Sequence, residues 1–321
     1  MENTTRTRPI PDLEDRFLGC LLGLALGDAL GARFEGYAAS SIRARFDNPR
    51  QLAFADQDEL WYTDDTQMAI GVAETLAERG QIDEPRLCQA FADNYVRSRG
   101  YGRGARVVIE LMQAGGDYRE AAQSYFPGGS YGNGAAMRVA PVGLLFRDDT
   151  ALLWEQARLS ALPTHVHPLG IEGAQLLALA VGIASTMDGF SRDEFFTPLI
   201  AACRSEAFRE RMQRAAEIEI PSDLDRLGNG IEALESVPTA IACFSVWPED
   251  FLETACGAVF LGGDTDTIAA MAGAISGAYL GTAGIHPKLI ARLESTPKGR
   301  EYFPQLSERL HQRYQSRARG S

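Results

Sequence analysis

The amino-acid sequence predicts an all-α protein, and three features of the chain indicate this class. Apolar residues recur at helical spacing through most of the chain. Alternating Val/Ile/Thr runs bounded by turn residues, the mark of strands, are almost absent. The long apolar segments are rich in Ala and Gly, which permits helix axes to approach closely. With no Pro- or Ser-rich linker and no repeat of fixed period, we expect a single many-helix domain over residues 15–317, preceded by a flexible tail over residues 1–14.

The predicted helices follow from apolar periodicity and from start and stop signals. The first, residues 15–30, combines apolar residues with small ones, and the second, residues 66–79, ends at Gly80, a typical helix stop. The other predicted helices span residues 84–98, 104–114, 135–146, 150–160, 170–187, 192–217, 230–246, 248–260, 265–281, 286–294 and 301–317. Residues 47–62, 115–134 and 218–230 are expected to connect them.

Composition narrows the possible partners and location. The chain has 321 residues and a formal net charge of −12 with no long basic run, so we expect no binding to a nucleic-acid backbone. Its five cysteines are scattered without a C-x-x-C pair, which favours reduced thiols in a reducing compartment. The apolar run near the N-terminus follows acidic residues and contains Asp28, unlike a signal peptide. We expect a cytoplasmic protein, not bound to membranes and monomeric.

Two Asp/Thr clusters stand at the start of apolar, helix-like runs: "YTDDTQMAI" at residues 62–70 and "GGDTDTIAA" at residues 262–270. One interpretation is helix capping, since Asp and Thr satisfy free N–H groups at helix N-termini. Each cluster, however, holds more polar residues than one cap requires, and the excess favours a shared site. Capping at two separate surface sites remains the alternative.

The second interpretation is a metal centre. If the two helix N-termini met, their four carboxylates would repel one another unless cations intervened, and two divalent ions would balance the charge. Carboxylate and hydroxyl ligands without His or Cys suit Mg²⁺, or Mn²⁺, rather than zinc. The Gly262–Gly263 pair allows a tight turn before the second cluster. The candidate ligands are Thr63, Asp64, Asp65, Asp264, Asp266 and Thr267.

Two further segments are candidates for binding or catalysis. Residues 27–37 end a buried-looking helix in a Gly-rich loop that carries Glu35, which is either functional or an exposed loop carboxylate. Residues 126–143 contain a Gly-rich loop before a helix, where backbone N–H groups could hold a phosphate, or which could be a plain turn. The flanking Phe126 and Tyr131 could stack on a nucleobase or belong to the core. The sequence disfavours a zinc site at "THVHP", because no cysteine lies nearby.

These segments resemble the ADP-ribosylglycohydrolase family. "GCLLGLALGDALGARFEG", "YTDDTQMAI", "GSYGNGAAMRVAPVG", "TH" at 164–165, "LGNGIEALESVPTAIACF" and "GGDTDTIAAMAGAISGAYLG" occur in the order typical of that family, over about residues 15–285. The resemblance implies an all-α orthogonal bundle with a binuclear Mg²⁺ (or Mn²⁺) centre at the base of a cleft. It also implies hydrolysis of an ADP-ribosylated protein or small-molecule conjugate, with release of ADP-ribose.

The resemblance also assigns residues. The six Asp and Thr residues above match the metal ligands, and Glu35 matches an acidic residue proposed to act in acid/base catalysis and in gating the metal site. Phe126 is matched with a spacing one residue shorter than the family pattern, and His167 has no counterpart. The positions that match substrate contacts are Gly129 and Ser130 at the diphosphate and distal ribose, Phe126 and Tyr131 around the adenine, and His165 at the substrate ribose.

Two other classes of protein stay open: a two-metal phosphoesterase that would cut the diphosphate, and a non-catalytic ADP-ribose binder or structural protein. Among linkages, the loop with Tyr131 resembles that of serine- and poly(ADP-ribose)-cleaving members. We therefore expect O-linked ADP-ribose, on serine or as O-acetyl-ADP-ribose, to be cleaved faster than the arginine linkage.

Overall fold

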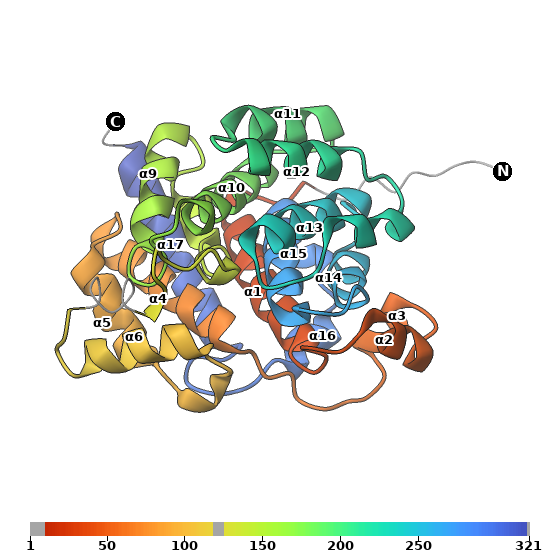
Figure 1. Ribbon diagram of the computed structural model, residues 1–321, viewed down its shortest axis with the longest axis horizontal. Helices are drawn as coiled ribbons and strands as arrows, with labels where there is room; N and C mark the ends of the chain where they lie inside the picture. Colours follow the sequence, from red (N-terminus) through yellow and green to blue (C-terminus); the bar gives the residue numbers. More distant parts are fainter. Residues whose placement is uncertain (1–9, 118–124, 320–321) are drawn as a thin grey trace.

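The computed structural model describes residues 10–117 and 125–319, and it confirms the all-α class. Within these ranges there is no strand, and only three isolated β-bridges join the loops. None of the described helices is long and apolar enough to cross a membrane. All five cysteines are buried free thiols. The helices form one globule with α1 and α15 at its centre (Figure 1).

Sixteen α-helices and four 3₁₀ segments make up the described part of this globule. They are α1 (Leu13–Gly31), α2 (Ala39–Arg45), α3 (Pro49–Ala53), α4 (Asp64–Arg79), α5 (Glu84–Asn94), η1 (Arg97–Arg99), α6 (Arg103–Gln113), η2 (Asn133–Ala135), α8 (Ala140–Leu145), α9 (Thr150–Ala161), α10 (Pro168–Ala184), α11 (Arg192–Ala202), α12 (Glu206–Ala216), η3 (Pro221–Leu227), α13 (Ala233–Val246), α14 (Phe251–Val259), α15 (Thr265–Leu280), η4 (Thr282–Gly284), α16 (Pro287–Arg292) and α17 (Tyr302–Ala318).

The structure divides one predicted helix into two. The predicted segment 192–217 forms α11 and α12, because Glu172 accepts the backbone N–H groups of Arg204 (2.7 Å) and Ser205 (3.0 Å) at the break. Ser205 then caps α12 by accepting the N–H of Phe208. A buried side chain on α10 thus interrupts a run that is helical by periodicity alone.

Other boundaries shift for local reasons. The predicted helix 135–146 is reduced to the 3₁₀ turn η2 and the short α8, which has a proline in its first turn. The predicted connections 47–62 and 218–230 contain α3 and η3, and α2 precedes them outside any predicted element. At the N-terminus, Asp12 caps α1 by accepting the N–H of Asp15, so Leu13 and Glu14 are helical. The rest of the predicted tail up to residue 9 lies outside the described residues.

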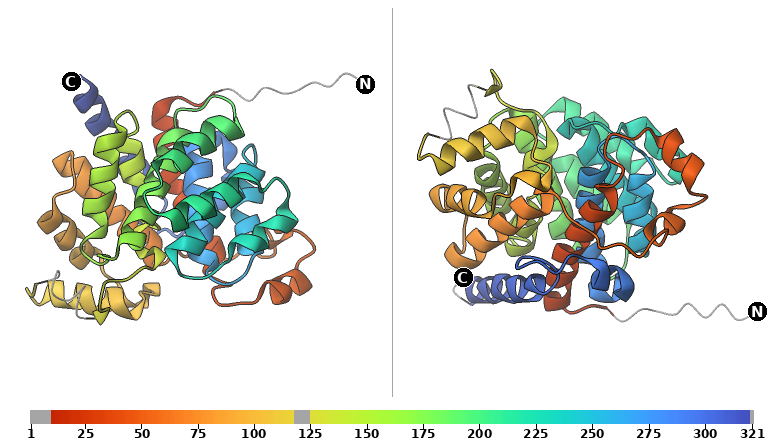
Figure 2. Two further views of the ribbon diagram at one scale, coloured as in Figure 1. Left: turned by 45° about the horizontal axis from the view of Figure 1, so that its top comes forward. Right: turned by 90° about the horizontal axis from the view of Figure 1, so that it is seen from below.

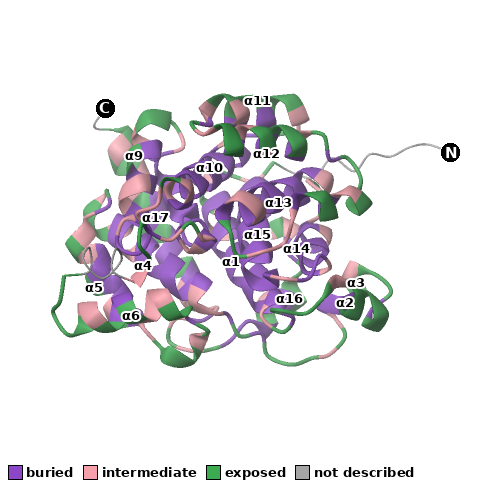
Figure 3. Ribbon diagram, in the orientation of Figure 1, coloured by how far each residue is buried: buried purple, intermediate pink, exposed green. Residues whose placement is uncertain are grey.

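The centre of the fold is an antiparallel pair, α1 and α15, whose backbones touch. A Cβ atom at Gly23 would lie 2.2 Å from the carbonyl oxygen of Gly273, and one at Gly27 would lie 2.0 Å from that of Ala269. Only glycine permits such an approach. Both helices are buried along almost their whole length, as the purple centre of Figure 3 shows.

The antiparallel pairing places the C-terminus of α1 beside the N-terminus of α15. α4 packs against both, and α17 packs against α1 and α4 along one side of the molecule (Figure 2). The helix N-termini that carry the two Asp/Thr clusters are therefore held at the same end of α1.

Candidate metal centre and substrate cleft

The two Asp/Thr clusters meet in one cleft. Asp64 and Asp65 at the start of α4 line the same cavity of about 300 Å³ as Asp264, Asp266 and Thr267 at the start of α15. This volume is at the lower end of the range for small-molecule sites. The structure thus excludes the alternative of two separate capping sites on the surface.

The acids are not used as helix caps. In α4 the cap is Thr63, whose Oγ1 accepts the N–H of Asp65 at 3.3 Å. In α15 the N-cap position is Asp264, but no side chain caps that helix. No carboxylate of either cluster is therefore used as an N-cap, although Asp266 Oδ1 accepts the N–H of Thr267 at 3.0 Å. The oxygen of Thr63 accepts one N–H and keeps a second lone pair for another partner.

Crowding and burial act strongly on these carboxylates. Burial raises the pKa of Asp64 to about 8 and, with the neighbouring Asp264, that of Asp266 to about 9. Burial and Asp266 raise the pKa of Asp65 well above its usual range. Like charges in a desolvated site favour the protonated forms unless a cation compensates them. Such a cluster is chemically suited to bind cations.

Glu35 is tied to the second cluster by the backbone. The N–H of Gly36 donates to the carbonyl oxygen of Gly263 (2.8 Å), and the N–H of Gly263 donates to that of Tyr37 (2.9 Å). Gly262 and Gly263 both have φ near +71°, and a Cβ atom at Gly263 would lie 2.2 Å from the carbonyl oxygen of Asn229. The tight turn expected before Asp264 is thus present, and it fixes the exposed Glu35 beside the acids.

The donor set fits a hard divalent cation. One carboxylate oxygen each from Glu35, Asp264 and Asp266 lie within 4.8 Å of one another. Asp65 Oδ2 is buried and has no hydrogen-bond partner among the described residues, which is costly for a carboxylate oxygen unless a cation binds it. Oxygen ligands without nitrogen or sulfur are those that Mg²⁺ and Mn²⁺ prefer.

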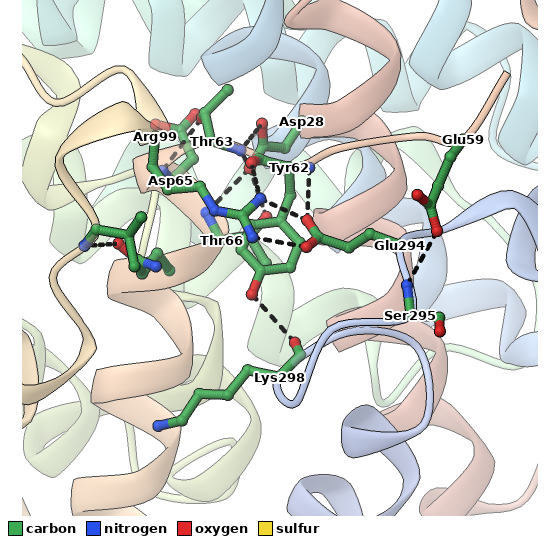
Figure 4. Close-up of polar contacts among 12 residues, drawn as sticks. Asp28, Glu59, Tyr62, Thr63, Asp65, Thr66, Arg99, Glu294, Ser295 and Lys298 are labelled. Carbon is green, nitrogen blue, oxygen red and sulfur yellow. Dashed lines mark hydrogen bonds and ion pairs between the residues drawn. The ribbon is translucent and has the colours of Figure 1, made fainter.

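Asp28 on α1, fully buried, lies behind the first cluster and holds its backbone (Figure 4). Its carboxylate accepts the N–H of Thr63 at 2.9 Å and the N–H of Thr66 at 3.0 Å, together with the hydroxyl of Thr66. Burial raises the pKa of Asp28 to about 6. Asp28 therefore sets where the first turn of α4 lies relative to α1.

A second buried carboxylate holds the strand-like segment before that turn (Figure 4). Glu294 accepts the N–H of Tyr62 (3.2 Å) and pairs with Arg99, whose Nη2 lies 2.6 Å from Glu294 Oε2. Arg99 also donates to the carbonyl oxygen of Tyr62 at 2.6 Å and lies over its ring. The backbone at Tyr62 is thus held on both its N–H and its C=O.

The opposite wall contributes Asn133, a residue that no sequence motif marks as functional. Its Nδ2 donates to Asp264 Oδ2 and to Ser236 Oγ (3.1 Å), and its backbone N–H donates to the carbonyl oxygen of Ile231 (2.9 Å). Asn133 therefore orients one carboxylate of the second cluster.

Only some of the residues matched to substrate contacts line the cleft. Ser130 and Phe126 line the cleft, and the ring of Phe126 packs against that of Tyr125, with centroids 4.7 Å apart. Gly129 and Tyr131 are outside the lining. Tyr131 is half exposed and faces His167, with ring centroids 5.7 Å apart, over a separate cavity of about 250 Å³.

His165 also lines the cleft but is buried. Burial and the neighbouring Arg138 lower the pKa of His165 to about 3, so the ring is neutral at physiological pH. His167, which has no counterpart in the family pattern, caps α10 by accepting the N–H of Leu169 (3.2 Å).

Sequence reasoning missed several residues of the site, and only some left a signal. Asp28 and Arg138 are single charges inside otherwise apolar helical runs, a pattern that indicates a buried partner. Glu294 and Asn133 stand in ordinary polar surroundings, and the sequence around them gives no such signal.

A larger groove of about 560 Å³ lies between α4, α5 and α17, away from the acids. It is lined by charged residues such as Glu74 and Lys298, which pair with each other.

Comparisons with known proteins show the family to which the chain belongs. The ADP-ribosylglycohydrolase family model matches residues 9–320. ADP-ribosylhydrolase ARH3 of Mus musculus is 34% identical over 94% of this chain and 92% of its own length; that of Danio rerio is 37% identical over 84% of each. A solved structure titled "ADP-ribosylglycohydrolase-related protein complex" superposes with a TM-score of 0.73 at 28% identity, covering 94% of this chain and 99% of the other.

The helical fold and its acidic cleft thus define a hydrolase that acts on glycosyl linkages of ADP-ribose. The chain belongs to the ADP-ribosylglycohydrolase family.

Proposed function

We propose that this protein hydrolyses the glycosidic bond of ADP-ribosylated substrates in a Mg²⁺-dependent reaction and releases ADP-ribose. The observation that carries the proposal is the meeting of two acidic helix N-termini and Glu35 in one cleft of ligand size. Two Mg²⁺ ions, with Mn²⁺ as a substitute, would be held by the two clusters. The proposed ligands are Thr63, Asp64, Asp65, Asp264, Asp266 and Thr267.

Hydrolysis at the anomeric carbon passes through an oxocarbenium-like transition state. Bound divalent cations supply positive charge that orients ribose hydroxyls and lowers the pKa of a water molecule. Glu35 is the exposed carboxylate among the described residues that line the cleft. It gives a proton to the leaving oxygen or takes one from the attacking water, a contribution of about 10²–10⁴-fold in rate.

The remainder of the cleft is proposed to bind the ADP-ribose half. Ser130 and the glycines of its loop present a hydroxyl and backbone groups to the diphosphate, and Phe126 offers a ring to the adenine. His165 lies toward the substrate ribose. Gly129 supports the loop at φ +88°, where its N–H donates to the carbonyl oxygen of Phe126 (2.7 Å). Tyr131 would reach the adenine only by leaving His167.

The proposed preference is for O-linked ADP-ribose, on serine or as O-acetyl-ADP-ribose. An O-glycoside requires only a proton donor at the leaving oxygen, which Glu35 provides. A guanidinium leaving group is a cation and needs additional negative charge at the rim of the cleft. Instead, the exposed residue Arg103 lines the cleft near Gly104 and disfavours a second cation there.

Product analysis tests the proposal. Matched serine- and arginine-ADP-ribosylated peptides are incubated with Mg²⁺, and the products are separated by chromatography. Free ADP-ribose supports the glycohydrolase, whereas AMP would indicate a phosphoesterase, and binding without product would indicate a binder. A kcat/KM that favours the arginine peptide tenfold or more, about 1.4 kcal/mol in transition-state binding, would reverse the proposed linkage preference and leave the reaction type intact.

A further inference from the structure

We propose that Arg138, acting through Thr164, fixes His165 as a hydrogen-bond donor that carries its ring proton on Nε2 and offers it to an oxygen atom of the ADP-ribose half. Arg138 and Thr164 are then positioning residues. The identity of the ligand rests on the proposed function, whereas the position of the ring proton is a property of the ligand-free protein.

The first link is the fully buried guanidinium of Arg138. An arginine can only donate hydrogen bonds. Its Nη1 donates to the carbonyl oxygen of Gly134 (2.7 Å), and its Nη2 donates to that of Ser160 (3.0 Å) and to Thr164 Oγ1 (2.9 Å). The hydroxyl oxygen of Thr164 is therefore an acceptor toward Arg138.

The second link is the hydroxyl proton of Thr164. Thr164 Oγ1 lies 2.7 Å from His165 Nδ1, and the hydroxyl has no third partner among the described residues. If Nδ1 carried the ring proton, two donors would point at this oxygen, and the buried hydroxyl proton would lack an acceptor, at a cost of about 1–3 kcal/mol. The hydroxyl therefore donates to Nδ1, and the ring proton resides on Nε2.

The surroundings of His165 exclude the doubly protonated ring. Burial comes first, and the charge of Arg138 adds to it, so that the pKa of His165 is lowered to about 3. No carboxylate among the described residues lies within ion-pair distance of Arg138, and Asp64 acts on it only at longer range, so the charge of Arg138 adds to burial in disfavouring a charged ring. A neutral imidazole with one defined donor is the result.

The third link is the direction of Nε2. Three glycines surround the free edge of the ring: a Cβ atom would lie 3.8 Å from Nε2 at Gly132, 2.8 Å from Cε1 at Gly134 and 3.4 Å from Cδ2 at Gly170. Nε2 has no hydrogen-bond partner among the described residues, and His165 lines the cleft beside Ser130. A single N–H donor on this wall suits a phosphate or ribose hydroxyl oxygen.

Long-range ¹⁵N–¹H correlation spectra of histidine-labelled protein test the position of the proton. The chain has only four histidines, and a His165→Gln variant identifies the signals of His165. We expect a pyridine-type nitrogen at Nδ1 and a pyrrole-type nitrogen at Nε2 in the ligand-free wild type, unchanged between pH 7.5 and pH 5. A proton on Nδ1, or a charged ring at pH 6, would overturn the inference. This measurement needs no substitution of Thr164, so it decides even if a variant fails to fold.

Thr164→Val and Thr164→Ser, with ADP-ribose binding measured by calorimetry, test the positioning. We expect Thr164→Val to show both tautomers and to raise the ADP-ribose Kd about three- to tenfold, as loss of one hydrogen bond does. Thr164→Ser, which keeps the hydroxyl, should restore both properties. Wild-type affinity and a single Nε2–H tautomer in a folded Thr164→Val variant would refute the role of Thr164.

Parallel titrations with ADP locate the acceptor. If Thr164→Val weakens ADP and ADP-ribose alike, the acceptor is an oxygen of the diphosphate or of the adenosine ribose; if it weakens ADP-ribose alone, the acceptor is on the distal ribose. Either result supports the inference. Failure of the wild type to bind ADP-ribose would instead reject the proposed function, while the tautomer of His165 would stand on its own spectrum.

Discussion

Asp28 and Gly31 lie one turn apart on α1 and hold the two halves of the acidic site. Asp28 accepts the N–H of Thr63 at 2.9 Å at the start of α4, and the carbonyl oxygen of Gly31 accepts the hydroxyl of Thr265 at 2.9 Å at the start of α15. A helix turn is rigid, so the distance between the two Asp/Thr clusters is set by α1 rather than by the loops that carry them.

Asp28→Asn should weaken metal binding without removing any proposed ligand. The amide would place an N–H₂ donor among the N–H and hydroxyl donors that now converge on Asp28, and a mismatch of this kind costs about 1–3 kcal/mol. We expect a tenfold or larger rise in the Mg²⁺ concentration needed for half activity. Asp193→Asn, at an exposed position on α11, is the matched control. Equal metal requirement in Asp28→Asn and wild type would contradict this positioning role.

Asp64→Asn and Asp264→Asn should each abolish activity while leaving the fold intact, because the two helices are proposed to serve one metal site. Loss of a metal ligand removes several kcal/mol of transition-state stabilisation, so we expect turnover to fall at least about a hundredfold. A chelator should do the same to the wild type. Turnover is measured against Mg²⁺ concentration with circular dichroism alongside, and full activity of either variant at saturating Mg²⁺ would rule out the shared site.

Glu35→Gln should separate binding from chemistry. The amide keeps the size of the side chain but cannot exchange a proton, so we expect ADP-ribose affinity within about twofold and a kcat lower by about 10²-fold or more. Calorimetry gives the affinity, and a single-turnover release assay gives the rate. If affinity collapses while kcat holds, Glu35 binds substrate and the acid/base role is wrong.

Glu294→Gln should destabilise the protein, because it leaves the charge of Arg99 without its partner. Glu294 is fully buried, and breaking a buried pair on one side costs about 3–5 kcal/mol. Glu301→Gln, which breaks the exposed pair with Arg300, should change the free energy of unfolding by less than about 1 kcal/mol. Urea unfolding of both variants makes the comparison. Similar losses in the two would show that the Arg99–Glu294 pair contributes no more than a surface pair.

The buried ring of His165 should make stability fall in acid. Its pKa is about 3 in the folded protein, below the ordinary value of 6.5, so between these values the unfolded chain binds a proton that the folded protein does not. The buried ring of His165 therefore costs no stability above pH 6.5, and it lowers the free energy of unfolding increasingly as the pH falls below 6.5. From pH 7.5 to pH 5 we expect His165 to lower the free energy of unfolding by about 2 kcal/mol, at 1.36 kcal/mol per pH unit. The raised pKa values of Asp64 and Asp266 act with the opposite sign in wild type and variant alike, so the measured quantity is the difference between the two. In urea titrations in Mg²⁺-free buffer, wild type should lose about 2 kcal/mol relative to His165→Gln over this range; the same pH dependence in both proteins would contradict the assignment.

Local sequence could predict the parts of this site that depend on neighbouring residues. The turn at Gly262–Gly263 and the excess of acids before α4 and α15 are visible because caps, turns and apolar periodicity are short-range features. The partners of those acids are not. Glu294 meets Arg99 across 195 positions in the chain, and Asn133 meets Asp264 across 131, and no local pattern specifies such pairs.

The boundary between α11 and α12 is likewise not specified by local sequence. The predicted helix 192–217 has helical periodicity throughout, and only the carboxylate of Glu172, brought in by α10, ends α11 and starts the next helix. Asp28 was visible as a charge in an apolar run, but its function depends on α4 arriving beside it. Tertiary contacts decided these features, and periodicity could not reveal them.

The glycine-to-backbone contact of α1 with α15 also governs when the protein can fold during synthesis. Gly31 and Thr265 are 234 residues apart, so at 5–20 residues per second α1 waits roughly 10–50 s for its partner to be made. Throughout that time α1 has α4 and α8 available but lacks α15, its main packing partner. Chains that stop before residue 265 never receive that partner, and such fragments should be substrates for chaperones and proteases rather than partly active enzymes.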